Sequence, residues 1–280
     1  MLLLVDLDGV VYRGADPVPG VAALLARRAE LGDDVVYVTN NSMFYRTAYV
    51  TRLAEMGAPV TAERVVTSAR ATALYIQRHL PGIRRVLVVG AGGLEREMRD
   101  VGLDVVTAAS AATRFSQEGV EGRIAAGSPD AVIVGLDPGL TYARIAVAAD
   151  AIRGGARFIA TNRDATYPAE RGLRPGAGSV VAAIEVAAGA RPDLEIGKPG
   201  PLLLEEAAAA VGRPAAEAVM IGDAMTDIAA ARAVGARSVL VLTGVTTAAQ
   251  LARVPASERP TEVAADSAEL AAILERLARS

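Results

Sequence analysis

The sequence predicts an α/β protein, in which a doubly wound parallel sheet carries a second, inserted α/β domain. Short apolar runs with the length of buried strands alternate along the chain with patterns typical of helices. Polar residues directly follow several of these runs, as they do after residues 2–5 and 35–38. Open parallel sheets bind ligands at the carboxyl ends of their strands, so these polar residues predict a site at that edge.

Composition limits the class of protein. The chain has 280 residues, no cysteine and a formal net charge of −3. This length suits one or two domains of roughly 100 to 200 residues each. The charge balance offers no basic field for nucleic acid, so we expect no nucleic-acid partner. A chain without cysteine has no disulfide framework, which is compatible with a reducing cytoplasm.

Two further features bear on location. No uninterrupted apolar run reaches the roughly 18 residues of a membrane span, so we expect no membrane partner. The first residues lack the basic segment of a secretory signal and lead straight into Asp6. Together these features predict a cytoplasmic protein.

The first apolar run ends in Asp6-Leu7-Asp8-Gly9. Because residues two apart on a strand point the same way, Asp6 and Asp8 are expected to project together. Two carboxylates that lose water side by side are unfavourable unless a positive group lies between them. A hard divalent cation such as Mg²⁺ suits carboxylate oxygens, so the pair is a candidate metal site. The alternative is a pair of turn or capping aspartates.

Lys198 is the only lysine of a chain that otherwise uses arginine for positive charge. A compact ammonium differs from a wide, planar guanidinium, so this lysine is predicted to lie where arginine cannot serve. The alternative is an ordinary surface lysine. Asparagine is nearly as scarce, because the chain contains only Asn40, Asn41 and Asn162.

The beginning of the chain predicts a strand, a helix and a second strand. Residues 10–20 are rich in glycine and proline and predict a loop or short hairpin. A helix is predicted over 21–31 and a strand over 35–38. This strand leads into Thr39-Asn40-Asn41-Ser42, whose hydroxyl, amide and backbone donors could bind an anion beside the aspartate pair. The alternative is an N-cap for the next helix, for which Ser42 alone would serve.

Helices are predicted over 44–56 and 68–77, and the stretch 79–82 after them indicates a domain boundary. This stretch contains His79, the only histidine of the chain. We interpret His79 as a solvated linker residue and not as a catalyst.

A strand predicted over 85–89 ends in Gly90-Ala91-Gly92-Gly93. This run is similar to the start of a dinucleotide-binding fingerprint, which needs a third glycine where Glu95 stands. We therefore interpret it as a strand-to-helix turn and not as an NAD site.

Residues 80–191 predict a second α/β domain. Its expected elements are two strands with a helix between them and a second helix, over 131–134, 157–160, 141–153 and 180–188. The polar stretch 161–179 predicts a long irregular loop, and such loops are often binding loops or lids. Its last residues, Pro175-Gly176-Ala177-Gly178-Ser179, could hold an anion at the start of a helix or simply cap that helix.

The last part of the chain returns to the first domain. Its expected strands and helices cover 194–196, 218–221 and 238–242, and 201–211, 226–234 and 268–278. The first strand leads into Gly197-Lys198-Pro199 and the second into Gly222-Asp223, with Asp227 one helical turn further on. Taken alone, Asp223 and Asp227 could simply cap a helix and complement its dipole.

The order of these motifs is more specific than any one of them. Along the chain they read DxDG, TNNS, GKP and GDxxxD. This order resembles the four motifs of the haloacid dehalogenase superfamily of Mg²⁺-dependent phosphatases, and the resemblance covers essentially the whole chain. The insertion, with FIATNRDATYP and PGAGS, resembles the C2-type cap of the type IIA branch. That branch contains p-nitrophenyl phosphatase-like, phosphoglycolate, glycerol-3-phosphate and pyridoxal-phosphate phosphatases.

The resemblance implies a fold and an activity. It implies a Rossmann-like doubly wound core formed by residues 1–79 and 192–280, with residues 80–191 as the inserted cap. The implied activity is Mg²⁺-dependent hydrolysis of small phosphomonoesters through an aspartyl-phosphate. Relatives often pair through the cap, so a homodimer is expected by analogy.

The resemblance also implies roles for the acidic residues. Asp6 would be the nucleophile, and Asp8 would protonate the leaving alcohol and then deprotonate water. Mg²⁺ would be held by Asp6, Asp223 and the backbone carbonyl of Asp8. Asp227 would stand behind these ligands. Many relatives have one more residue between the last two acids, which leaves the distance of Asp227 from the metal open.

The remaining candidate residues divide between core and cap. The implied phosphate-binding residues are Thr39, Asn40, Asn41 and Lys198. The candidates for substrate selection in the cap are Asn162, Asp164, Thr166 and Gly178. Metal and lysine would together neutralise the charge on the transferring phosphoryl group.

Other functions on the same fold stay open. Phosphoryl transfer to another acceptor would use the same residues. Dehalogenation needs neither metal nor the second aspartate, so the intact DxD motif disfavours it. A non-catalytic protein that binds phosphorylated ligands would predict a damaged motif, and none is damaged.

Overall fold

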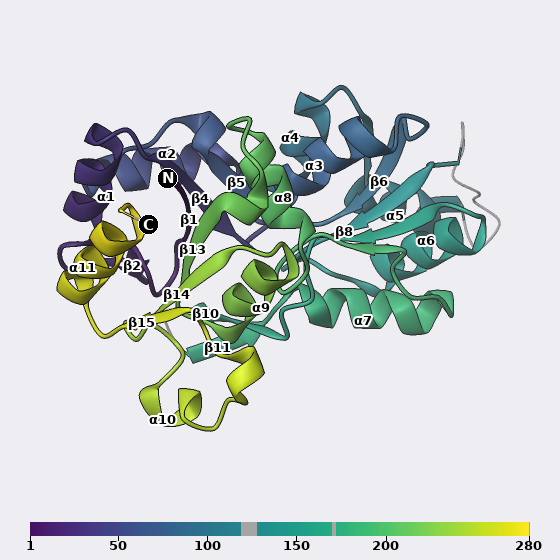
Figure 1. The fold of residues 1–280 in the computed structure, drawn as a ribbon. Helices are drawn as coiled ribbons and strands as arrows, with labels where there is room; N and C mark the ends of the chain where they lie inside the picture. Colours follow the sequence, from purple (N-terminus) through teal and green to yellow (C-terminus); the bar gives the residue numbers. More distant parts are fainter. Residues whose placement is uncertain (119–127, 170–171, 280) are drawn as a thin grey trace. The chain divides into compact units, whose positions relative to one another are not determined.

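The structure of the chain, a computed structural model, describes residues 1–118, 128–169 and 172–279 (Figure 1). The chain divides into two compact units. The first consists of Met1–Thr39, Arg46–Thr67 and Lys198–Ser280, and the second of Asn40–Tyr45 and Ser68–Gly197. Each unit contains a parallel sheet, so the predicted class, an α/β core with an inserted α/β cap, is confirmed.

A six-stranded parallel sheet in the order β15-β14-β13-β1-β4-β5 forms the first unit. Its strands are β1 (Leu2–Asp6), β4 (Asp34–Thr39), β5 (Val65–Thr67), β13 (Ala218–Gly222), β14 (Arg237–Val241) and β15 (Glu262–Ala264). Every residue of β1 is buried, as expected for a strand covered on both faces. Because β1 pairs with β13 and with β4, the ends that carry Asp6, Thr39 and Gly222 share one edge of the sheet.

Helices cover both faces of this sheet. They are α1 (Val21–Glu30), α2 (Arg46–Glu55), α8 (Leu202–Ala209), α9 (Met225–Ala233) and α11 (Ser267–Leu277), and the short helix α10 (Ala248–Leu251) belongs to the same unit. Leu3 and Val5 of β1 share a core cluster with buried side chains of α1, α2 and α11. Leu2 and Leu4 alternate with them and face the other way, and α8 contacts β1 and β4. The predicted hairpin after β1 is confirmed as β2 (Tyr12–Arg13) and β3 (Asp16–Pro17).

The second unit, the cap, is built on a five-stranded parallel sheet in the order β12-β9-β8-β6-β7. Its strands are β6 (Arg85–Val89), β7 (Asp104–Thr107), β8 (Ala131–Val134), β9 (Arg157–Ala160) and β12 (Leu194–Glu195). β12 pairs with β9 so that Glu195 lies opposite Ala160. The segments that follow these two strands, beginning at Thr161 and Ile196, therefore leave the sheet side by side.

The cap helices are α3 (Ser68–His79), α4 (Gly92–Asp100), α5 (Ala108–Glu118), α6 (Tyr142–Arg153) and α7 (Ala177–Ala188). Leu87 and Val89 of β6 share a core cluster with α5, α6 and α7. Helices α3 and α4 contact each other, and Figure 1 shows them on the other side of the sheet from α7. Within the described ranges, no helix combines the length and apolar character needed to cross a membrane.

The prediction of a long irregular loop over 161–179 is wrong. Strands β10 (Thr166–Ala169) and β11 (Gly172–Pro175) form a two-stranded antiparallel ribbon, and α7 already begins at Ala177. All residues of β11 are exposed, so this strand lacks the alternating apolar face that marks a strand in a sequence. Residues 170–171 of this stretch lie outside the described residues.

Two smaller expectations near the cap are also wrong. Ser42 does not cap the next helix, because α2 begins at Arg46 and the Ser42 hydroxyl accepts a hydrogen bond from the Leu136 amide at 3.2 Å. His79 is exposed as expected, but it ends helix α3 and its ring centroid lies 4.6 Å from that of Tyr75. A linker therefore does not begin at His79. The predicted boundaries, 1–79 with 192–280 against 80–191, stay a prediction.

Replacing Leu4 in β1 by alanine should lower the free energy of unfolding by about 2–5 kcal/mol, because the side chain is fully buried and a cavity would remain. Urea unfolding followed by circular dichroism measures this loss. Leu31→Ala is the matched control, since this leucine is 62% exposed and its loss should change the free energy by under about 0.5 kcal/mol. Equal effects of the two substitutions would contradict the assignment of β1 to the core.

Candidate active site

Three buried carboxylates meet where β1 and β13 end. Asp6 is the last residue of β1, Asp223 follows β13, and Asp227 lies in the first turn of α9. One oxygen from each carboxylate lies within 4.8 Å of one from each of the others. The residues are 7%, 4% and 1% exposed. The sequence placed Asp227 behind the metal ligands, and the structure brings its carboxylate into the same cluster.

Lys198 lies against two of these carboxylates. Its Nζ is 2.5 Å from Oδ1 of Asp6 and 2.6 Å from Oδ1 of Asp227. The first contact is a hydrogen bond as well as an ion pair, and the second is an ion pair. The residue is only 4% exposed, so the reading as an ordinary surface lysine is wrong. The only lysine of the chain thus joins the first motif to the last.

The site strongly affects the pKa values of its members. Burial raises the pKa of Asp6 well above its usual value, with Lys198 opposing and the other two carboxylates adding to the shift. Burial also raises the pKa of Asp223 to about 6, with a further contribution from Asp227. For Lys198 burial acts to lower the pKa, but Asp227 and Asp6 outweigh it, so the net pKa is raised. The Lys198 ammonium therefore stays charged. The raised pKa values of Asp6 and Asp223 indicate that this single positive charge does not fully compensate the burial of the carboxylates.

A divalent cation fits this donor set. When ionised, the three carboxylates and one ammonium leave two negative charges, which a divalent cation would balance. Space beside Asp223 is kept by two glycines. A Cβ at Gly9 would lie 2.2 Å from Oδ2 of Asp223, and one at Gly244 would lie 1.9 Å from it. Larger residues at these positions would displace the carboxylate.

Asp8 lies apart from the three clustered carboxylates. Burial raises its pKa, and the charges of Arg52 and Lys198 act against this shift. Asp8 forms a backbone bridge with Tyr12, whose ring centroid lies 3.4 Å from the Arg52 guanidinium carbon. Asp8 is thus not one of the three carboxylates within 4.8 Å of one another, but the Lys198 charge at that cluster still acts on it, so a shared site for Asp6 and Asp8 stays a prediction.

The polar run after β4 divides between the two units. Thr39 is 4% exposed and follows Val38, the partner of Asp6 in the sheet. Asn40 and Asn41 are grouped with the cap. The Asn40 side-chain nitrogen lies 3.1 and 3.0 Å from the two carboxylate oxygens of Asp164. The side-chain oxygen of Asn41 accepts a hydrogen bond from the Met43 amide at 2.8 Å.

The cap candidates largely contact one another. The Asn162 side chain donates to the backbone carbonyl of Asn40 at 2.7 Å. The Gly178 amide donates to the backbone carbonyl of Asp164 at 2.9 Å, so this helix start binds part of its own domain. Thr166 begins β10 and is exposed. The structure thus brings Asn40, Asn162 and Asp164 together, and leaves Thr166 on the ribbon.

Comparisons with known proteins agree with this geometry. Two family models match the chain: haloacid dehalogenase-like hydrolase over residues 3–104 and HAD-hydrolase-like over residues 195–270. The acid sugar phosphatase of Staphylococcus epidermidis is 35% identical over 245 residues, which is 87% of each chain. The chain belongs to the haloacid dehalogenase-like hydrolases. Within them it has the C2 cap of the type IIA, p-nitrophenyl phosphatase branch, so the resemblance seen in the sequence is confirmed.

Two solved structures extend the comparison. The 4-nitrophenylphosphatase of Thermotoga maritima is 33% identical with a TM-score of 0.83, over 97% of this chain and 96% of that one. The glycerol phosphate phosphatase of Mycobacterium tuberculosis, in complex with magnesium, is 38% identical with a TM-score of 0.80, over 96% and 76%. By homology, this hydrolase is a phosphatase.

Sequence reasoning missed the segment that holds Asp223 in this hydrolase. The Val245 amide donates to Oδ2 of Asp223 at 2.7 Å, and the Thr243 hydroxyl donates to the Gly9 carbonyl at 2.7 Å. The segment follows β14, at the same edge of the sheet as the site. Its position after an apolar strand, together with Gly244, was the available signal.

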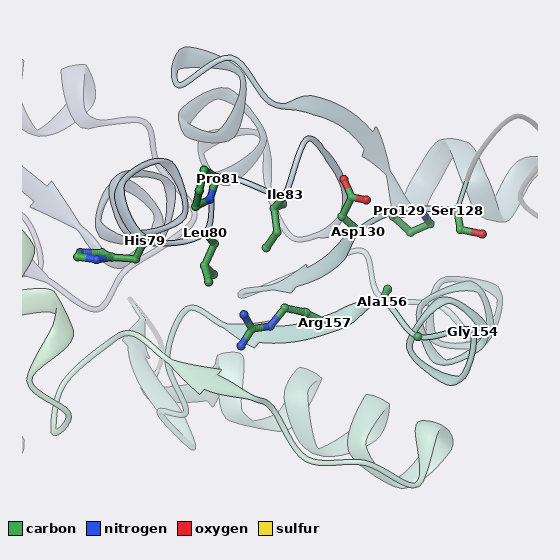
Figure 2. A pocket seen from close by; sticks show the side chains of 12 residues that line it. His79, Leu80, Pro81, Ile83, Ser128, Pro129, Asp130, Gly154, Ala156 and Arg157 are labelled. Atoms are coloured by element: carbon green, nitrogen blue, oxygen red, sulfur yellow. The ribbon is translucent and has the colours of Figure 1, made fainter.

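A separate groove lies in the cap at the amino ends of its strands (Figure 2). Its volume is about 570 Å³, and its lining includes His79, Asp130 and Arg157. Asp130 accepts hydrogen bonds from the backbone amides of Arg84 and Arg85, both at 2.8 Å, which lower its pKa. None of the predicted site residues lines this groove.

Mg²⁺ should raise the melting temperature more at about pH 8 than at about pH 5, because a metal ligand must be deprotonated. The raised pKa of Asp223, about 6, means that a proton competes with the metal below that value. Without metal, stability changes with pH in the opposite direction. The contribution of Asp223 to the free energy of unfolding falls as the pH rises from 3.8 toward 6, because the folded protein binds the proton more tightly than the unfolded chain. Thermal unfolding with Mg²⁺ or EDTA at both pH values measures this.

The control for this prediction is Asp223→Asn, which should remove both the stabilisation by Mg²⁺ and its dependence on pH. A metal-induced shift of equal size at both pH values in the unsubstituted protein would contradict the assignment of Asp223 as a ligand.

Proposed function

We propose that this hydrolase is a Mg²⁺-dependent phosphatase that cleaves small phosphomonoesters through an aspartyl-phosphate on Asp6. The observation that carries the proposal is the contact of Lys198 with Asp6 inside a cluster of three buried carboxylates. This cluster lies at the carboxyl edge of a parallel sheet, where such folds bind ligands. The relatives named above, an acid sugar phosphatase, a 4-nitrophenylphosphatase and a glycerol phosphate phosphatase, support the reaction class.

The proposed reaction proceeds in two steps at phosphorus. A carboxylate oxygen of Asp6 attacks phosphorus, the bond to the ester oxygen breaks, and Asp8 gives its proton to the leaving alcohol. Asp8, now a carboxylate, takes a proton from water, whose oxygen attacks phosphorus and releases phosphate and free Asp6. Burial raises the pKa of Asp8, which favours the protonated form needed first.

The phosphoryl oxygens need positive charge and hydrogen-bond donors throughout. We assign the charge to Lys198 and the donors to Thr39 and the backbone at Asn40 and Asn41. Mg²⁺, when bound by Asp6, Asp223 and the Asp8 carbonyl, supplies further neutralisation of the phosphoryl group. Asp227 would hold Lys198 in place, since its other carboxylate oxygen accepts a hydrogen bond from the Ala224 amide at 3.0 Å.

The substrate is proposed as a small phosphorylated metabolite. The relatives are named for sugar phosphate, glycerol phosphate and 4-nitrophenyl phosphate, and the group common to all three is the phosphomonoester. Selection of the leaving group is proposed for the cap stretch that contains Asn162, Asp164, Thr166 and Gly178, without assigning a direct contact to each of these residues. A cytoplasmic location and a homodimer formed through the cap are part of the same proposal.

Asp6→Asn should abolish turnover of p-nitrophenyl phosphate while the protein stays folded, because the amide cannot attack phosphorus. Steady-state assays with Mg²⁺, and with EDTA as the metal-free control, measure this, and circular dichroism checks the fold. Activity within a few-fold of the unsubstituted enzyme, or full activity in EDTA, would refute the assignment.

Lys198→Arg should lower kcat/KM by about 100-fold or more, although the charge is kept, because a planar guanidinium does not fit between Asp6 and Asp227. The matched control is Arg213→Lys, in a half-exposed pair with Glu217 on the same unit, which should leave kcat/KM unchanged. The idea fails if both substitutions have the same small effect.

A further inference from the structure

We propose that Asp164 is a positioning residue for catalysis: through its hydrogen bonds to Asn40 it holds the chain segments that carry Thr39 and Lys198. This inference rests on the proposed function and deepens it. It gives Asp164 an indirect role in binding the phosphoryl group, in place of direct contact with the leaving group.

Three of the predicted ligand-binding residues form a closed ring of hydrogen bonds. The Asn40 side chain donates to the carboxylate of Asp164 at 3.1 and 3.0 Å. The Asp164 amide donates to Oδ1 of Asn162 at 3.1 Å. The Asn162 side-chain nitrogen then returns to the backbone carbonyl of Asn40 at 2.7 Å. The Ser68 hydroxyl donates to the same carbonyl at 2.6 Å, so this stretch of backbone is held from several sides.

Gly197 packs directly against this ring. A Cβ at Gly197 would lie 2.6 Å from Oδ1 of Asn40, 2.7 Å from Cβ of Asn162 and 2.8 Å from the carbonyl of Thr161. Only a glycine allows this approach without movement of the backbone. The Gly197 amide also donates to that Thr161 carbonyl at 2.8 Å, so the segment is fixed in register.

The chain passes from one unit to the other at two places beside this ring, after Thr39 and after Gly197. Thr39 belongs to the first unit and Asn40 to the cap, and likewise Gly197 belongs to the cap and Lys198 to the first unit. The ring therefore holds the covalent neighbours of Thr39 and Lys198, the two residues assigned to the phosphoryl group. A shift of Asn40 or Gly197 would move its neighbour.

Charge argues against direct contact of Asp164 with a phosphate ester. A carboxylate beside a phosphate dianion is repulsive unless a cation neutralises it. A carboxylate accepts hydrogen bonds and does not donate them, so it fixes the Asn40 side-chain amide with its nitrogen toward Asp164. The backbone of Asp164 is itself hydrogen-bonded to Gly178 and to Asn162. Its carboxylate is therefore held in a position from which it can fix Asn40.

Exchanging the two side chains tests this arrangement. Asp164→Ala removes the acceptor, and Asn40→Asp places two carboxylates opposite each other. The double variant N40D/D164N reverses donor and acceptor and keeps the backbone contacts of the ring. Asp130→Ala is the matched control, since Asp130 also binds cap backbone amides but at the other edge of the cap sheet.

The readouts are kcat and KM with p-nitrophenyl phosphate and with glycerol phosphate, and the inhibition constant of inorganic phosphate. We expect each single substitution to raise the inhibition constant and lower kcat/KM by about 10- to 100-fold, equally for both esters. The exchange variant should have a kcat/KM at least about tenfold higher than either single variant, because a hydrogen bond to a charged group is restored. Asp130→Ala should change neither constant.

Three outcomes would overturn the inference. The exchange variant could be no better than the single variants, or Asp164→Ala could leave phosphate inhibition unchanged. A loss confined to glycerol phosphate would instead make Asp164 a direct ligand of the leaving group. An unsubstituted enzyme without phosphatase activity would refute the proposed function, which is a distinguishable result. If Asp164→Ala does not fold, Asn40→Asp and the exchange still decide the question.

Discussion

The ammonium group of Lys198, held between the carboxylates of Asp6 and Asp227, is the interaction on which the rest of this structure depends. All three residues are buried, with 7% or less of their surface exposed to solvent. A buried charge that loses its partner is destabilising by several kcal/mol, so these residues tolerate burial only together. The contact therefore requires β1, the segment after β12 and the first turn of α9 to be in place at once. The same contact thus stabilises the fold and assembles the site.

The parallel sheet explains why such distant residues meet. In-register pairing of β1 with β4 and β13 brings their carboxyl ends to one edge, and each end leads directly into polar residues. Glycines then let polar groups approach. Gly9 and Gly244 leave room for the Asp223 carboxylate, and Gly197 leaves room for the Asn40 side chain. Backbone geometry thus decides where charge can be gathered in this protein.

The sequence predicted those parts whose cause is local. A buried strand followed by acidic residues marks Asp6 and Asp223, and scarcity marks Lys198. The link between Asn40 and Asp164 was not predictable, because the two residues are 124 positions apart and each had a plausible role as a ligand. The ribbon of β10 and β11 was missed because the exposed residues of β11 show no apolar alternation. Short strands such as β5 give too few residues for a periodic pattern.

The most direct test of the central claim is a crystal structure with Mg²⁺ and beryllium trifluoride, an analogue of a phosphoryl group on a carboxylate. The account predicts the beryllium on a carboxylate oxygen of Asp6, the metal between Asp6 and Asp223, and the ammonium of Lys198 against a fluoride. Electron density for beryllium at any other side chain, or a metal that does not touch Asp6, would contradict it.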